Sequence, residues 1–115
     1  MIINKPWGHE NIWAKTDKYV GKILHINPGH KLSLQKHLIK EETIMVIEGN
    51  LHLVYYENEN EIKRILKKGD VFHVKPNTIH RFCSSAEDMN PVVLVEVSTP
   101  ELDDIIRLSD EYDRK

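Results

Sequence analysis

Turn-forming residues recur about every ten residues through the middle of this chain, and that spacing leaves room only for short strands. The turns are rich in glycine, proline, asparagine and aspartate, which favour tight backbone conformations. They stand at Asn27-Pro28-Gly29, Glu48-Gly49-Asn50, Glu57-Asn58-Glu59-Asn60, Lys67-Lys68-Gly69-Asp70 and Pro76-Asn77-Thr78. Many short strands joined by such turns predict an all-β domain, either a sandwich or a barrel.

The segments between the turns are the expected strands, and together they predict a barrel over about residues 20–97. The expected strands are 21–26, 31–37, 42–48, 50–56, 61–66, 71–74, 79–83 and 91–97. Only the end of the chain has the pattern of a helix, over about residues 99–110. The run Ser98-Thr99-Pro100-Glu101 offers capping hydroxyls, a first-turn proline and an acid at the positive end of a helix. An apolar stripe follows at helical spacing, made of Leu102, Ile105 and Ile106.

Length and charge limit the classes of protein to which the chain can belong. Its 115 residues suit one domain, taken as residues 1–115. The 16 basic and 18 acidic side chains are mixed along the chain, so we expect neither a nucleic-acid partner nor a membrane partner. The start of the chain lacks the apolar core of a signal peptide, and Cys83, the single cysteine, allows no internal disulfide. These features predict a cytoplasmic protein.

Four polar residues have the spacing of a metal site. Gln35 and His37 are two apart on an expected strand, so their side chains point to the same face. Glu42 can reach the same point from the next strand, and His80 from a strand further along. Two imidazoles, a carboxylate and an amide oxygen inside a small barrel form a suitable site for one divalent ion.

The same residues resemble the paired motifs of the cupin superfamily. Gly29, His37, Glu42 and Gly49 match the first motif, and Gly69, Pro76 and His80 match the second. Gln35 stands where most cupins have a histidine, and in this respect the chain resembles the type II mannose-6-phosphate isomerases. Further matches to those isomerases are Lys5-Pro6-Trp7-Gly8, Glu10, His80-Arg81, Glu96 and the tail from Asp104 to Arg114. The resemblance implies a stand-alone, single-domain cupin with a jelly-roll barrel.

The resemblance also implies a reaction, the isomerisation of an aldose phosphate to a ketose phosphate, with mannose 6-phosphate to fructose 6-phosphate as the first choice. One divalent metal ion would polarise the sugar oxygens, with zinc favoured and manganese, iron, cobalt or nickel left open. Gln35, His37, Glu42 and His80 are the expected metal ligands. A base must move the proton, and the expected catalytic residues are Glu96, Lys31 and Arg81. Ser33, Lys40 and Arg114 are expected to bind substrate. Ser33 alternates with Gln35 and His37 and so should face the same cavity, and cationic side chains suit phosphate.

Two other functions remain open at this stage. A cupin without catalytic activity could bind a sugar or a nucleotide sugar, and a metal-dependent dioxygenase could occupy the same fold. We also expect a homodimer, because the edge strands of an open jelly roll need cover, and the N-terminal Ile2-Ile3 could add to a neighbour's sheet.

Overall fold

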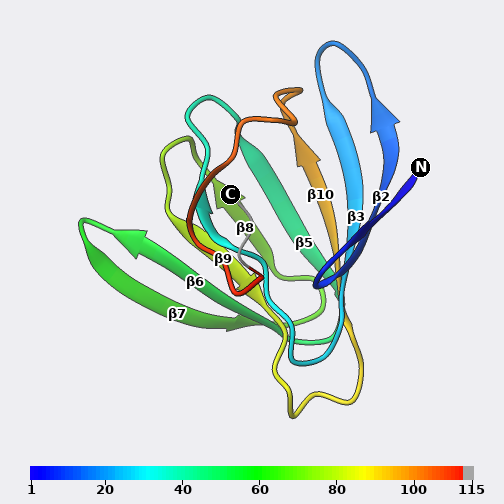
Figure 1. The fold of residues 1–115 in the computed structure, drawn as a ribbon, viewed down its shortest axis with the longest axis vertical. Coiled ribbons are helices and arrows are strands. Elements are labelled where there is room, and N and C mark those ends of the chain that lie inside the picture. The colour runs from blue at the N-terminus through cyan, green and yellow to red at the C-terminus, as the bar shows by residue number, and fades with distance from the viewer. Residues whose placement is uncertain (113–115) are drawn as a thin grey trace.

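Two antiparallel β-sheets face each other in the computed structural model, which describes residues 1–112 (Figure 1). One sheet has six strands in the order β1-β2-β3-β10-β5-β8, and the other has five in the order β11-β4-β9-β6-β7. The strands are β1 (Ile2–Lys5), β2 (Gly8–Lys15), β3 (Val20–Ile26), β4 (Leu34–Lys36), β5 (Glu42–Glu48), β6 (Leu51–Glu57), β7 (Asn60–Leu66), β8 (Val71–Val74), β9 (His80–Cys83), β10 (Val92–Ser98) and β11 (Ile106–Ser109). The predicted all-β fold is confirmed. From β3 to β6, and again from β7 to β11, consecutive strands alternate between the two sheets as in a jelly roll.

The core lies between the sheets and is built by the period-two alternation of the strands. On β10, Val92 and Leu94 point inward and are fully buried, whereas Val97 faces outward and is 51% exposed. Their partners across the barrel include Leu53 on β6 and Phe82 on β9, both 1% exposed. Burial of these side chains is the main force that closes the two sheets on each other.

Gly49 occupies the turn between β5 and β6, where no other residue fits without strain. Its φ of 78° lies in the left-handed region, and a Cβ there would lie 2.6 Å from the carbonyl oxygen of Pro91. The turn can therefore reverse directly against the chain that leads into β10.

The C-terminal segment forms a strand, and the predicted helix over about residues 99–110 is wrong. Residues 106–109 pair as β11 with β4, in the register Ile106 with Lys36 and Arg107 with Gln35. The short β4 offers unpaired backbone groups along one edge, and pairing with them satisfies the tail. Leu102 and Ile105 line the cavity between the sheets.

The N-terminal residues also belong to the barrel, which begins well before residue 20. β1 pairs with β2 through a turn at Pro6-Trp7, and β2 pairs with β3. Ile2 and Ile3 therefore pair with β2 of their own chain. No helix among the described residues has the length and apolar character needed to cross a membrane.

Candidate functional site

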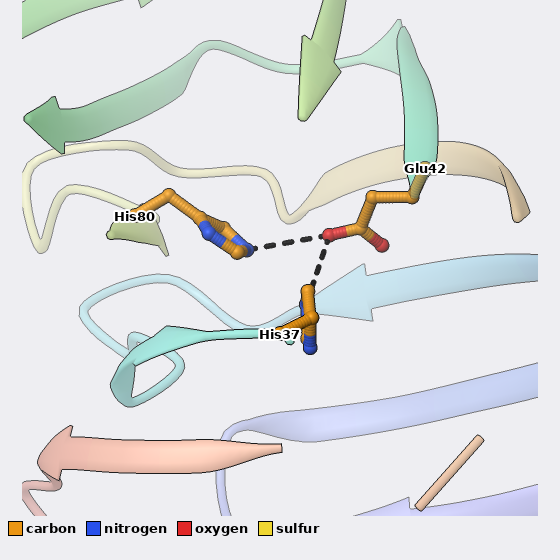
Figure 2. Close-up of side chains that lie close together, drawn as sticks. All are labelled: His37, Glu42 and His80. Atoms are coloured by element: carbon orange, nitrogen blue, oxygen red, sulfur yellow. Dashed lines mark ion pairs between the residues drawn. The ribbon is translucent and has the colours of Figure 1, made fainter. Parts of the chain in front are cut away.

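Three polar side chains from separate segments of the chain converge inside the barrel, as Figure 2 shows. Glu42 begins β5, His80 begins β9, and His37 follows directly after β4. Glu42 Oε1 lies 3.4 Å from His37 Nε2 and 3.3 Å from His80 Nε2. All three residues are buried, and their ligand atoms lie within 4.8 Å of one another. We call His37, Glu42 and His80 the triad.

The geometry of the triad fits a single metal ion. Two atoms bound to zinc at about 2.1 Å and at a tetrahedral angle lie about 3.4 Å apart, which matches the spacing from Glu42 to each histidine. Within the described residues, three buried atoms of the triad form no hydrogen bond with another group. They are His37 Nε2, His80 Nε2 and Glu42 Oε1. Buried polar atoms without partners are costly, and a shared cation would satisfy all three at once.

Backbone carbonyls fix both imidazoles from behind. His37 Nδ1 donates to the carbonyl oxygen of Asp104 at 2.6 Å, and His80 Nδ1 donates to that of Thr78 at 2.8 Å. A carbonyl can only accept, so each Nδ1 carries a proton, and in the neutral imidazole Nε2 is then the nitrogen that offers a lone pair to a metal. Such outer contacts are typical of histidines that bind metal.

Asp104 also holds the loop that joins the triad to the neighbouring lysine. Its carboxylate accepts hydrogen bonds from the backbone N–H groups of three successive residues, at 3.1 Å, 2.7 Å and 2.9 Å. The donors are Leu38, Ile39 and Lys40. These bonds, that of Lys40 first, lower the pKa of Asp104 to about 2. The predicted site did not include Asp104, because backbone N–H donors leave no signal in the sequence.

Lys40 lies between two buried carboxylates and balances their charge. Its Nζ is 3.5 Å from Glu42 Oε2 and 3.4 Å from Glu96 Oε2. Burial alone would lower the pKa of Lys40, but Glu96 and Glu42 raise it overall. Lys40 therefore stays cationic and holds both carboxylates close to the triad.

The two carboxylates differ in protonation. Burial and then the charge of Glu42 raise the pKa of Glu96 to about 8. Burial would raise the pKa of Glu42 as well, but His37, His80, Glu96 and Lys40 hold it well below its usual value. At neutral pH Glu42 is thus ionised and Glu96 is mostly protonated, so the two neighbouring carboxyl groups differ in charge.

Gln35 and Ser33 lie next to the triad. Gln35 lines the central cavity and pairs across the sheet with His80. Ser33 is buried, and its Oγ donates to Gln35 Oε1 at 2.8 Å. Ser33 therefore orients the Gln35 amide, a contact different from the substrate contact expected of it.

Lys31 and Arg81 do not line the cavity in the structure. Lys31 forms an isolated bridge with Cys83, because regular pairing in this segment begins only at Leu34 and the expected alternation is out of phase before it. Arg81 points away from the triad: its Nε donates to Leu32 O at 2.9 Å, and Nη2 donates to Ser109 O at 3.0 Å. Arg114 lies outside the described residues.

The cavity beside the triad has a volume of about 300 Å³. Its wall includes Lys40 and Glu96, and it extends to a second charged group on β1, β2 and β3. That group consists of Lys5, Glu10 and Lys22, which the predicted site did not include. The sequence does contain a signal for the inward position of Lys22. On a strand Lys22 alternates with the apolar Leu24 and Ile26, so all three side chains face the interior.

Comparison with known proteins finds relatives that are named mannose-1-phosphate guanylyltransferases. The chain is 31% identical over 111 residues to a mannose-1-phosphate guanylyltransferase of Salmonella muenchen, a match that covers 94% of this chain and 22% of that protein. The chain thus spans about a fifth of the length of the curated relatives it matches.

Solved structures agree on the fold. KdgF from Halomonas sp. aligns with a TM-score of 0.74 at 19% identity, over 90% of this chain and 91% of that one. A cupin described as a sugar phosphate isomerase, from Silicibacter pomeroyi, aligns with a TM-score of 0.66 at 20% identity, over 79% of this chain and 58% of that one. The model of the family described as "Mannose-6-phosphate isomerase C-terminal" matches residues 1–110. The chain therefore belongs to that family and has the cupin fold.

Proposed function

We propose that this chain is a metal-dependent isomerase of a phosphorylated sugar, and that it interconverts mannose 6-phosphate and fructose 6-phosphate. The buried triad beside a cavity that also holds Glu96 carries the proposal. Membership of the family supports it. The fold shared with the sugar phosphate isomerase of Silicibacter pomeroyi is consistent with it.

The triad would hold one divalent ion, and Gln35 stands beside it as a further oxygen ligand or as a support. Zinc is favoured over manganese, iron, cobalt and nickel because isomerisation needs no change of redox state and the donors are nitrogen and oxygen. When bound, the ion supplies Lewis-acid polarisation of the sugar carbonyl and the adjacent hydroxyl.

Glu96 is the proposed proton carrier. Its ionised form, a minor fraction at neutral pH because the pKa of Glu96 is about 8, accepts the proton from C2 of the open-chain aldose and returns it to C1. The hydroxyl proton passes from O2 to O1, so no atom is gained or lost. Lys40, 3.4 Å from Glu96 Oε2, stabilises the carboxylate whenever its proton has left. The buried position keeps water from competing for the proton.

The size of the cavity favours a monosaccharide phosphate over a nucleotide sugar. A volume of about 300 Å³ is at the lower end for ligand pockets. A nucleotide sugar carries a base, a second sugar ring and a diphosphate in addition to the hexose, and it exceeds this space. A non-catalytic module that binds a sugar phosphate is the second candidate. The relatives named mannose-1-phosphate guanylyltransferase support it, because their name also gives a mannose phosphate as the substrate. A dioxygenase would differ by its need for iron and oxygen.

The test of the isomerase is a coupled assay for fructose 6-phosphate formed from mannose 6-phosphate by metal-loaded protein. Glu96→Gln keeps the shape of the side chain and removes the base, so turnover should fall at least ~10²-fold while the metal content stays normal. Activity in Glu96→Gln within threefold of the wild type would assign the proton transfer to another group. Absence of turnover on several phosphorylated aldoses would refute the isomerase and leave the binding module.

The metal site is tested by elemental analysis of protein purified without chelator. Wild-type protein should carry close to one divalent ion per chain, and the double variant His37→Ala/His80→Ala should carry none. The matched control His52→Ala/His73→Ala removes two imidazoles outside the triad and should keep the metal. Full metal content in the triad variant would refute the assignment, and iron whose removal abolishes an oxygen-dependent activity would favour the dioxygenase.

A further inference from the structure

The second charged group in the cavity has no role in the chemistry above. Lys22 Nζ donates to Glu10 Oε2 at 3.2 Å, and Lys5 Nζ lies 3.9 Å from Glu10 Oε1. Glu10 is 7% exposed and Lys22 is 8% exposed, so this ion pair is taken almost entirely out of water. Two ammonium groups share one carboxylate, which leaves this end of the cavity with a positive charge.

Structural stability alone gives no reason for a lysine at this point. Lys22 interrupts the inward row of β3, between the buried Val20 and Leu24. A buried ion pair contributes little net stability, because loss of hydration offsets the attraction, and apolar residues of similar volume usually serve as well. A cationic pair on a cavity wall instead suits a ligand that brings negative charge.

The distance to the triad fits a sugar phosphate. In the six-stranded sheet β3 lies next to β10, and β10 lies next to β5, the strand that begins with Glu42. Neighbouring strands are about 4.8 Å apart, so β3 and β5 are separated by about 10 Å. An open-chain hexose 6-phosphate spans a comparable length between its carbonyl carbon and its phosphorus. One molecule can therefore reach from the triad to Lys22.

We infer that Lys5 and Lys22, which both pair with Glu10, bind the phosphate group of the substrate, while the carbonyl end of the sugar lies at the triad. This inference rests on the proposed sugar-phosphate substrate and assigns the orientation of that substrate. An ammonium group has three donors, and Lys22 uses one of them on Glu10. The remaining donors of the two lysines can grip a phosphate through charge-assisted hydrogen bonds.

The experiment is calorimetric titration of the metal-loaded protein with mannose 6-phosphate and with mannose, and the ratio of the two affinities is the readout. Lys5→Gln and Lys22→Gln should each reduce the preference for the phosphorylated sugar about tenfold to a hundredfold. Glu10→Gln frees both ammonium groups and should increase the preference. Lys31→Gln is the matched control, since Lys31 lies away from the cavity, and it should leave the ratio unchanged.

The outcomes separate this inference from the proposed function. If Lys22→Gln fails to fold because Glu10 loses its partner, the half-buried Lys5 and the Glu10→Gln variant still decide the question. An unchanged ratio in Lys5→Gln and Glu10→Gln, or a loss of preference in Lys31→Gln, would overturn the phosphate site. So would a wild-type protein that binds both sugars equally. A phosphate preference that follows the predicted pattern without any turnover would uphold the site and refute the isomerase.

Discussion

Removal of the Asp104 carboxylate should weaken metal binding, although Asp104 itself touches no metal. The carboxylate accepts three backbone N–H groups from residues 38–40, and the carbonyl of the same residue accepts the Nδ1 proton of His37. Asp104→Ala removes the three loop bonds and releases the segment that presents this carbonyl. His37 then loses the support that aims its Nε2 at Glu42.

The expected size of the effect follows from the position of Asp104 behind one of three protein ligands. Loss of such an outer contact typically costs about 10–100-fold in metal affinity. Asp104→Asn keeps one acceptor oxygen but places an amide N–H₂ against donors, so its loss should be smaller than that of Asp104→Ala. The control Asp103→Ala removes the adjacent carboxylate and leaves the three loop bonds in place, so its affinity should stay within threefold of the wild type.

The assay is competition for zinc with a chelator of known affinity, on proteins whose fold is checked by circular dichroism. The measurement is made at neutral pH, where Asp104 is fully ionised. Because its pKa is lowered to about 2, its contribution to stability is present above the usual aspartate pKa of 3.8 and is lost only as the pH falls through about 2. An affinity of Asp104→Ala within threefold of the wild type, in protein of normal fold, would refute the argument.

Three further predictions concern the barrel and its assembly. Phe82→Ala should lower the free energy of unfolding by about 3–5 kcal/mol in a urea titration, because Phe82 is 1% exposed in the core, and a cost below about 1 kcal/mol would contradict its role there. Gly49→Ala should lower the melting temperature more than Gly69→Ala, because both have positive φ but only Gly49 would place a Cβ 2.6 Å from Pro91 O; equal shifts would contradict this. Light scattering should give a homodimer, since β1 and β7 end their sheets as edges, and a monomer mass near 13.5 kDa would contradict it.

The sequence predicted the middle of the barrel well because turn chemistry is local. The expected strand over residues 42–48 coincides with β5, and that over 71–74 coincides with β8. Glycines and asparagines at the turns fix where the chain reverses, whatever the rest of the molecule does. Of the triad residues, His80 follows such a turn, at Pro76-Asn77-Thr78. His37 and Glu42 flank residues 38–41, which contain no turn-forming residue of this kind, so their place in the site was predicted from the spacing of the motif.

The two ends of the chain were harder to predict because they depend on partners far away in sequence. The stripe Leu102, Ile105 and Ile106 has helical spacing, yet the unpaired edge of β4 provides backbone hydrogen bonds that a strand can use. Tertiary pairing of this kind overrides local propensity. Lys31 shows the same limit on a smaller scale, because alternation predicts a face only where the strand is regular, and β4 begins at Leu34.

Charged residues on the inner face of the six-stranded sheet connect the two ends of the cavity. Lys22 on β3 lies directly opposite Glu96 on β10 in the sheet register, while Glu10 holds its ammonium group from the other side. The charge of Lys22 lowers the pKa of Glu96 and so partly offsets the effects of burial and of Glu42. A phosphate bound at Lys22 would neutralise that influence and favour the protonated form of Glu96. The proposed phosphate site and the proposed proton carrier are therefore electrostatically coupled through Lys22. We expect the pKa of Glu96 to be higher with a sugar phosphate bound than with the unphosphorylated sugar.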